Sequence, residues 1–403
     1  MIIERKETKK LKLQRNWIFL FGRRKTGKSF LAKNFINWDE YFFIKRDKAI
    51  LSEKEGLLGY ETFLNILKRQ LKNDKIIVVD EFHRLGDDFL DIIHSLERNG
   101  KLIVISSTLF LSKQLLGKRS PILGLFAEMP LKIISLDDTL KALNKLKLDL
   151  SKKELLENAI LLREPITVMS FDKNQKARNT FSEVILGSIK TVPALVGEIF
   201  LEEEKTLSAV YEGILRAIAV GKTVSTEIAN YLFSKKLIIN NDASIVQQYL
   251  KNLIEFGIIK RIQVYNRKKF IYKHISPLVS LFYYADEKYN VSEREVTEKE
   301  IIRIIDEVMP KIVEDNIREL FAIKYGFIET IVETKDYDID AYLLKFKKPE
   351  MAIEIKWKRK VSKEDIAKAE KNLEKIDAKR KILFVADKSL VHSKLETLDI
   401  SDL

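Results

Sequence analysis

Residues 22–29 read Gly22-Arg23-Arg24-Lys25-Thr26-Gly27-Lys28-Ser29, between the apolar run WIFLF (17–21) and the segment SFLAKNFI (29–36). This stretch matches the motif G-x-x-x-x-G-K-[ST] at every position, and it has the strand-before, helix-after context that the motif requires. The two glycines let backbone N–H groups turn toward phosphate oxygens. Lys28 is expected to neutralise the β- and γ-phosphates of ATP, and the Ser29 hydroxyl to bind Mg²⁺. Residues 22–29 therefore predict an ATP-binding loop.

A second part of the same site follows the apolar run Ile76–Val79, which ends in Asp80 and Glu81. Asp80 is expected to hold Mg²⁺, mostly through water, and Glu81 to polarise the water that attacks the γ-phosphate. An acid pair used only to cap a strand is the alternative. Ser107, at the end of the next apolar run, is chosen as the side chain that senses the γ-phosphate, although serine is also common at strand ends. Catalysis is thus assigned to Glu81, Lys28 and Ser107.

The first third of the chain alternates short apolar runs with helix-length amphipathic segments. Such continuous apolar strands are typical of a parallel sheet covered on both faces, so we expect an α/β domain with about five strands. The expected strands are Trp17–Phe21, Tyr41–Ile44, Lys75–Val79, Lys101–Ser106 and Leu131–Leu136.

The remainder changes character along its length. Residues 138–204 have a helical pattern, and residues 205–285 are predicted as several helices followed by a two-strand ribbon with Asn266-Arg267 near its turn. A long amphipathic helix is expected over 298–325. After it, the sequence predicts three strands, a helix over 362–376 and a final strand, KILFVAD.

The order of these motifs resembles the archaeal ATPase family of the AAA+/STAND class. The phosphate-binding loop, the acid pair after a strand, Ser106-Ser107 and the segment LSKQLLGKRSPILG occur in the family order, with matches at Leu116-Gly117, Pro121 and Gly124. Leu125 stands where the family has an arginine that reaches a neighbouring subunit's γ-phosphate; Lys118 or Arg119 is the alternative donor. Arg163-Glu164-Pro165 stands where the family has Gly-Gly-x-Pro. Both departures predict slow hydrolysis.

The resemblance extends to residues 207–284, which match the family's winged helix. Its pattern implies a recognition helix over 243–256, with Asp242 as N-cap, Gly257 at the end, and Ile245, Tyr249, Leu250, Leu253 and Ile254 buried. Polar residues on the other face, and the basic wing, are expected to contact DNA bases and phosphates. The expected DNA-binding residues are Gln247, Gln248, Lys251, Arg267, Lys268 and Lys269. A winged helix that binds protein or inhibits the chain remains the alternative.

A second acidic group lies near the C-terminus. Asp338 and Asp340 share one face of a strand, and Glu354 and Lys356 share a face of the next. The element order resembles the PD-(D/E)xK nuclease-like fold, which this ATPase family often carries. The resemblance implies a second Mg²⁺ or Mn²⁺ on Asp340 and Glu354, water activation by Lys356, and Glu319 from the preceding helix as a further ligand. The alternative is an inactive domain that holds DNA or another subunit.

With this resemblance, we expect an α/β multidomain chain with four parts. They are a P-loop parallel-sheet ATPase core (1–137), a helical lid (138–204), a winged helix (205–290), and a linker helix with an α/β restriction-endonuclease-like domain (291–403).

Composition narrows the function classes further. The chain of 403 residues has 72 Lys and Arg against 59 Asp and Glu, a net charge of +13, and no cysteine. Disulfides, thiolate metal sites and cysteine nucleophiles are therefore excluded, and four histidines make a multi-histidine metal centre unfavourable. Positive charge concentrates in residues 1–28 (ten basic, two acidic) and 205–290 (thirteen basic, six acidic), which favours polyanionic partners. No apolar run spans a bilayer, and the charged start is no signal peptide, so we expect a cytoplasmic protein.

The sequence therefore predicts a Mg²⁺-dependent ATPase that acts on DNA, with nucleotide state repositioning the winged helix and the nuclease-like domain. A homo-oligomer and no membrane partner are expected. One alternative is a STAND-type signalling switch that binds protein partners, with ATP as a slow timer. Another is an intact nuclease regulated by ATP, in defence against mobile DNA.

Overall fold

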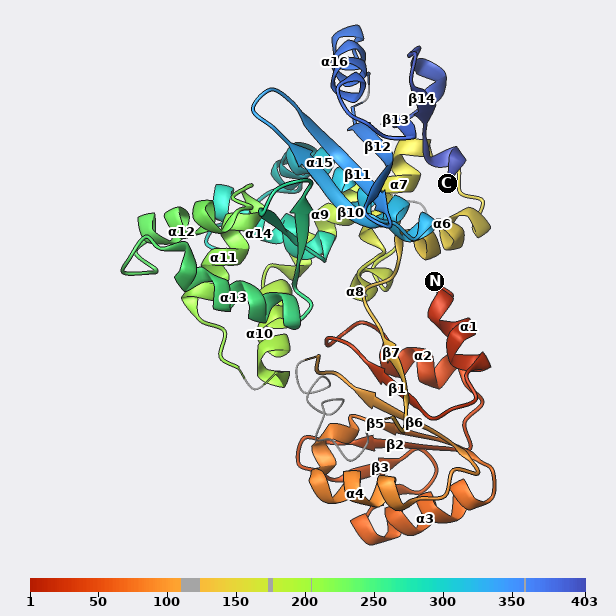
Figure 1. Ribbon diagram of the computed structural model, residues 1–403. Coiled ribbons are helices and arrows are strands. Elements are labelled where there is room, and N and C mark those ends of the chain that lie inside the picture. The colour runs from red at the N-terminus through yellow and green to blue at the C-terminus, as the bar shows by residue number, and fades with distance from the viewer. Residues whose placement is uncertain (110–123, 173–176, 204, 359) are drawn as a thin grey trace.

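The computed structural model describes residues 1–403 apart from 110–123, 173–176, 204 and 359. The core that contains residues 22–29 lies at one end of the molecule, and a second sheet lies at the other, with helices between them (Figure 1). The segment 111–123, which carries Leu116-Gly117, Lys118, Arg119 and Pro121, lies outside the described residues.

The N-terminal core is a seven-stranded sheet of order β4-β3-β2-β5-β6-β1-β7. The strands from β2 to β7 in this order are parallel, and β3 and β4 form an antiparallel hairpin on the edge. The strands are β1 (Ile18–Phe21), β2 (Glu40–Ile44), β3 (Ile50–Ser52), β4 (Gly56–Leu58), β5 (Ile76–Asp80), β6 (Lys101–Ser106) and β7 (Ala127–Pro130). The helices are α1 (Lys6–Leu13), α2 (Lys28–Phe35), α3 (Tyr60–Lys72) and α4 (Asp87–Ser95), with the short 3₁₀ turn η1 (Phe82–Leu85).

Alternate residues of the central strands enter separate apolar clusters on the two faces. Phe19 and Val79 pack on one face, and Leu20 and Val78 on the other. This pattern confirms the parallel α/β core that the continuous apolar runs predicted.

One expected strand of the core was wrong. The last strand is Ala127–Pro130 rather than residues 131–136, because the chain leaves the sheet after Leu131 and Ser135 caps the next helix by accepting the Asp138 N–H. The apolar side chains of Leu131 and Ile134 are buried without a strand ladder, so hydrophobicity alone misassigned them.

Helices occupy the middle of the chain. They are α6 (Leu136–Lys145), α7 (Lys152–Leu161), α8 (Pro165–Val168), α9 (Ala177–Ser188), α10 (Thr191–Glu202), α11 (Ala209–Ala219), α12 (Ser225–Ser234), α13 (Ala243–Glu255), α14 (Pro277–Tyr289), α15 (Glu298–Tyr325) and, near the C-terminus, α16 (Lys363–Glu374). Asp242 caps α13 by accepting the Ser244 N–H, and Gly257 follows it at φ +68°, as expected. Val246, Leu250 and Leu253 form its buried face, whereas Ile245, expected inside, is 37% exposed.

The second sheet has the order β14-β13-β12-β11-β10-β8-β9. Its strands are β8 (Ile259–Val264), β9 (Phe270–His274), β10 (Ile328–Glu333), β11 (Asp338–Lys345), β12 (Lys348–Lys356), β13 (Arg380–Val385) and β14 (Glu396–Leu398); η2 (Lys388–Leu390) and η3 (Ile400–Asp402) are short turns. The ribbon β8–β9 joins this sheet because β8 pairs in parallel with β10, at Gln263↔Thr330 and Val264↔Ile331. One apolar core then runs from the middle helices into α15 and the C-terminal strands, so these parts form one packed body.

His274, at the end of β9, makes the stability of this body sensitive to acid. Burial lowers the pKa of His274 to about 3, and its Nε2 is buried without a hydrogen-bond partner. As pH falls, the unfolded chain, in which His274 has an ordinary pKa, takes up the proton before the folded chain does. The contribution of neutral His274 to the free energy of unfolding is therefore complete above about pH 6.5 and is lost as pH falls below that value. Urea unfolding should show a loss of about 1 kcal/mol per pH unit from this group.

The matched variants for this prediction are His274→Gln and His94→Gln, since His94 is exposed on α4. We expect His274→Gln to flatten the dependence of unfolding free energy on pH between 6.5 and 5, and His94→Gln to leave it as in the wild type. Equal slopes for all three proteins would contradict the assignment.

Candidate nucleotide-binding site

The loop at residues 22–29 has the geometry of a phosphate cradle. Gly27 takes φ +88° directly before α2, a conformation that favours glycine. At Gly22, a Cβ atom would lie 2.1 Å from the Leu131 carbonyl oxygen, so only glycine fits between β1 and the chain after β7. The Lys28 ammonium lies inside the loop and donates to the Gly22 and Arg23 carbonyls at 2.8 and 2.9 Å. The cradle therefore places its cation where phosphate oxygens would lie.

Asp80 ends β5 beside this loop and is 1% exposed. The Tyr41 hydroxyl of β2 donates to Asp80 Oδ2 at 2.6 Å, while Asp80 Oδ1 is buried without a hydrogen-bond partner. Burial raises the pKa of Asp80, and the neighbouring Ser29 and Tyr41 hydroxyls oppose the rise. A buried carboxylate oxygen with no partner, next to a serine hydroxyl, fits Mg²⁺ with its water ligands. Ser29 and Asp80 are therefore the residues that would hold the ion.

Tyr41 fixes which oxygen of Asp80 is available, which gives a testable consequence. Tyr41→Phe removes a hydrogen bond to a buried carboxylate, and the Mg²⁺ concentration needed for half-maximal nucleotide binding should rise about tenfold. Binding in EDTA should not change. The control is Tyr60→Phe, because the Tyr60 hydroxyl, which packs against the apolar cluster on the other face of the same sheet, is buried without a partner. The same Mg²⁺ dependence in Tyr41→Phe and Tyr60→Phe would overturn this role.

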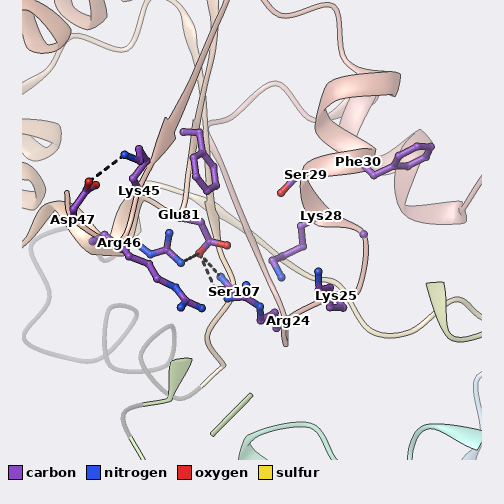
Figure 2. A pocket seen from close by; sticks show the side chains of 13 residues that line it. Arg24, Lys25, Lys28, Ser29, Phe30, Lys45, Arg46, Asp47, Glu81 and Ser107 are labelled. Carbon is purple, nitrogen blue, oxygen red and sulfur yellow. Dashed lines mark hydrogen bonds and ion pairs between the residues drawn. The ribbon is translucent and has the colours of Figure 1, made fainter. Parts of the chain in front are cut away.

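Glu81 and Ser107 are brought together across β5 and β6. Glu81 Oε2 accepts the Ser107 hydroxyl at 2.7 Å and the Ser107 N–H at 3.3 Å (Figure 2). The Glu81 backbone takes φ +58°, a left-handed conformation that costs a non-glycine residue about 1–2 kcal/mol. After this turn the Glu81 side chain lines the cavity beside the phosphate loop, and a strained backbone of this kind is typical of functional sites.

A cavity of about 620 Å³ joins these groups, with Lys28, Ser29, Glu81 and Ser107 on its wall. Arg24 and Lys25 of the predicted loop also line it, whereas Arg23 and Thr26 are buried beneath it. Sequence reasoning missed other basic residues that line the cavity: Lys45, Arg46 and Arg84. Lys45 and Arg46 follow β2 (Figure 2), and Arg84 lies in η1, so only the fold brings these residues to the phosphate loop. These charges favour a polyanionic ligand such as a nucleoside triphosphate.

Leu125, which stands where the resemblance predicted an arginine, is 9% exposed and packs in the apolar core of the N-terminal sheet. Its side chain does not line the nucleotide cavity. Arg84 also lines the cavity, and its Nη2 lies 3.9 Å from Glu81 Oε2.

The dipeptide Arg163-Glu164 links this site to the distant sheet. Glu164, fully buried, accepts the Arg23 guanidinium at 2.7 Å, and Arg163 on the other side contacts Glu319 of α15 at 2.5 Å. Glu319 in turn contacts Lys260 of β8 at 2.8 Å. Opposite charges thus run from the phosphate loop to the β8–β9 ribbon. A second link is the ion pair between Arg24 and Glu198 of α10, at 2.8 Å.

Asp340 and Glu354 of the predicted C-terminal site lie close together, but Glu314 takes the place expected of Glu319. Lys356 contacts Glu354 at 2.6 Å and Asp340 at 4.0 Å. Glu319 does not belong to this acidic group. Burial alone would raise the pKa of Glu319, but the charges of Arg163 and Lys260 hold that pKa below its ordinary value. Glu314, five residues earlier on α15, faces Asp340, and burial and then that neighbouring charge raise the pKa of Glu314 to about 8. The same causes raise the pKa of Glu354 to about 7. In the described residues, no three acids or histidines are arranged to hold a metal ion.

The predicted DNA-contacting residues fall into two groups. Gln247, Gln248 and Lys251 are exposed on α13, and Arg267 and Lys268 are exposed at the tip of the β8–β9 ribbon. Lys269, by contrast, contacts Glu333 of β10 at 2.8 Å, so it fastens the ribbon to the neighbouring strand.

No single helix in the described part of the chain is long and apolar enough to cross a membrane. A pair of helices bent by 63°, Arg178–Gly187 with Thr191–Leu201, passes the same test by length and composition.

Comparison with known proteins agrees with the N-terminal geometry. A family model described as "AAA domain" matches residues 14–126. No curated protein matches the chain.

The solved structures with similar folds include the Walker-type ATPase PABY2304 of Pyrococcus abyssi, at 20% identity and TM-score 0.50, covering 70% of this chain and 96% of that one. Aeropyrum pernix ORC1 in complex with DNA matches at 16% identity and TM-score 0.33, over 68% and 88% of the two chains. A STAND protein of Pyrococcus horikoshii, PH0952, matches at 15% identity and TM-score 0.33, and the match covers 81% of this chain and 48% of that one. Residues 14–126 are therefore similar to an AAA domain, in a chain whose fold is similar to that of a Walker-type ATPase.

Proposed function

We propose that this chain is a Mg²⁺-dependent ATPase that acts on DNA, and that nucleotide state controls its DNA-binding parts. The observation that carries the ATPase is one cavity wall formed by Lys28, Ser29, Glu81 and Ser107, with the buried Asp80 beside it. In this arrangement Lys28 and the basic lining hold the triphosphate, Asp80 and Ser29 hold Mg²⁺, and Glu81 orients and polarises the attacking water. Mg²⁺, when bound, neutralises charge on the β- and γ-phosphates.

We assign four parts: an ATPase core (1–137), a helical lid (138–204), a winged helix (205–290), and a linker helix with a nuclease-like domain (291–403). The DNA surface would be the exposed face of α13 with Gln247, Gln248 and Lys251, together with Arg267 and Lys268. Lys269 would contribute through its ion pair to the position of the ribbon and not through phosphate contact.

The path from ATP to DNA would run through Arg163-Glu164. A change at the phosphate loop alters the surroundings of Arg23, whose partner Glu164 is joined by one peptide bond to Arg163 and hence to Glu319 and Lys260. Because these ion pairs are largely buried, breaking one is costly, so the loop and the ribbon side are expected to change together.

The ATPase is tested by turnover of wild type and Lys28→Ala with Mg²⁺, and DNA action by binding of wild type to duplex and single-stranded DNA. We expect turnover that disappears in Lys28→Ala, and DNA affinity that falls steeply with salt. No DNA binding at low salt would remove the DNA part.

A signalling switch of the STAND type is the second candidate, favoured by the burial of Leu125 in place of an arginine. Such a switch would retain its nucleotide, turn it over slowly and self-assemble with ATP. Light scattering with and without ATP separates the two: ATP-dependent assembly without DNA affinity supports the switch.

The C-terminal domain would add a nuclease if Asp340 and Glu354 hold a second Mg²⁺ or Mn²⁺ and Lys356 orients the attacking water; Glu314, which faces Asp340, would take the place expected of Glu319. The test is cleavage of DNA by wild type and Glu354→Ala with Mg²⁺ or Mn²⁺. If neither protein cleaves DNA, or if Glu354→Ala cleaves it as fast as the wild type does, the C-terminal domain is not a nuclease and its remaining role is binding.

A further inference from the structure

The hairpin between β11 and β12 has an unusual tip, Lys345-Phe346-Lys347-Lys348. Lys345 pairs with Lys348, so Phe346 and Lys347 are the two turn residues. All four side chains are exposed, and that of Phe346 is 87% exposed. The hairpin projects beyond the body of the second sheet (Figure 1).

The backbone of this tip is also unfavourable for its residues. Phe346 has φ +47° and Lys347 has φ +64°, which describes a two-residue turn in which Asn-Gly is the favoured sequence. A left-handed conformation costs a bulky residue about 1–2 kcal/mol. An exposed phenylalanine recovers none of this cost by burial. Packing therefore gives no reason for Phe-Lys at these positions, and a strained, exposed aromatic residue points to binding.

A groove runs from this hairpin to the tip of the β8–β9 ribbon. It has a volume of about 510 Å³ and is lined by Arg267, Lys268 and Lys347, with Tyr265 and Ile328 among its other lining residues. The hairpin cations Lys345 and Lys348 flank Phe346 and Lys347 in sequence.

The charge of this groove is not neutralised by the protein. No carboxylate lines it. The nearby acids are already engaged, since Glu329 contacts Lys260 and Glu333 contacts Lys269. Within the described part of the chain, none of Arg267, Lys268, Lys345, Lys347 and Lys348 is seen in an ion pair. The groove is therefore an uncompensated cationic surface that reaches, through Lys347, the hairpin tip that carries the exposed Phe346.

We propose that this groove binds single-stranded nucleic acid, with phosphates on Arg267, Lys268 and Lys347 and an unpaired base stacked on Phe346. A cationic track with a stacking aromatic residue is how proteins hold single strands with little sequence preference. An acidic peptide would use the cations but gives no role to the exposed ring. This inference rests in part on the proposed DNA action and adds to it a second surface, distinct from α13.

The test is fluorescence anisotropy with a labelled oligo-dT strand and a duplex of the same length. Phe346→Ala should weaken binding of the single strand about tenfold and affect the duplex less, while Phe346→Trp should retain binding. Leu390→Ala is the matched control, because Leu390 is also an exposed apolar residue of this part of the chain, at 72%. These surface substitutions should leave the melting temperature unchanged.

Charge reversal supplies a second measurement. Arg267→Glu with Lys347→Glu should weaken binding and make its salt dependence shallower, by about one unit of slope per lost phosphate contact. Lys371→Glu, an exposed cation on α16, is the control.

The outcomes separate this proposal from the DNA action it extends. If wild type binds no nucleic acid, the proposed DNA action fails first. If wild type binds the single strand and the groove variants bind it equally well, the groove is not the binding site, and α13 remains the proposed DNA surface. Equal loss for Phe346→Ala and Phe346→Trp, or an effect on duplex alone, overturns the stacking role. Competition by poly-glutamate that is as effective as by oligo-dT overturns nucleic acid as the ligand.

Discussion

Replacing Glu81 with glutamine is expected to lower ATP turnover about 100- to 10,000-fold, the usual contribution of a group that takes a proton from the attacking nucleophile. The amide keeps the size of the side chain and can still contact Ser107, which now donates to Glu81 Oε2 at 2.7 Å. Binding of Mg²⁺ and ATP should persist, because the phosphate loop and Asp80 are unchanged. Phosphate release under single-turnover conditions measures the chemical step directly.

The matched control for this variant is Glu61→Gln, which makes the same chemical change at an exposed position of α3. It should turn over ATP like the wild type. If Glu81→Gln kept wild-type turnover, the water-polarising group would have to be sought elsewhere on the cavity wall.

Breaking the Arg23–Glu164 pair should have the largest effect on stability. Glu164→Gln leaves the Arg23 guanidinium buried, 5% exposed, beside a neutral amide. The loss of a buried partner costs about 3–5 kcal/mol of unfolding free energy. Urea unfolding with nucleotide absent measures it. The double variant Arg23→Met with Glu164→Leu removes both charges and should recover most of the loss.

The control for the buried pair is Asp137→Asn, which breaks the exposed pair with Lys141 on α6. A solvent-screened pair of this kind should contribute less than about 1 kcal/mol. A cost for Glu164→Gln no larger than that of Asp137→Asn would contradict the structural importance of the link between the loop and α15.

The sequence predicted correctly those elements that depend on residues close to one another in the chain. The turn from β1 into α2 that carries residues 22–29, the strand β5 that ends at Asp80 and the long helix Glu298–Tyr325 depend on short-range spacing, and each element is found where the sequence predicted it. The residues that were missed depend on the approach of distant segments. Arg46 and Arg84 enter the nucleotide cavity from different elements, and no spacing in the sequence relates them to Lys28.

The acids of α15 illustrate the same limit. Glu314 and Glu319 are five residues apart, which turns them by about 140° around the helix axis. Which one faces Asp340 depends on the rotation of α15 against the sheet, a property of packing. The pairing of β8 with β10 is likewise long-range, and it explains why Lys269 contacts Glu333 where a contact with DNA phosphate was expected.

The central claim is that nucleotide at the P-loop controls the hold on DNA. It is tested most directly by the affinity of Glu81→Gln for labelled DNA with and without Mg²⁺ and ATP, since this variant should bind ATP without consuming it. We predict that the two affinities differ by about 5- to 150-fold, the usual range of coupling between sites. DNA binding that is equally tight in both conditions would contradict the claim.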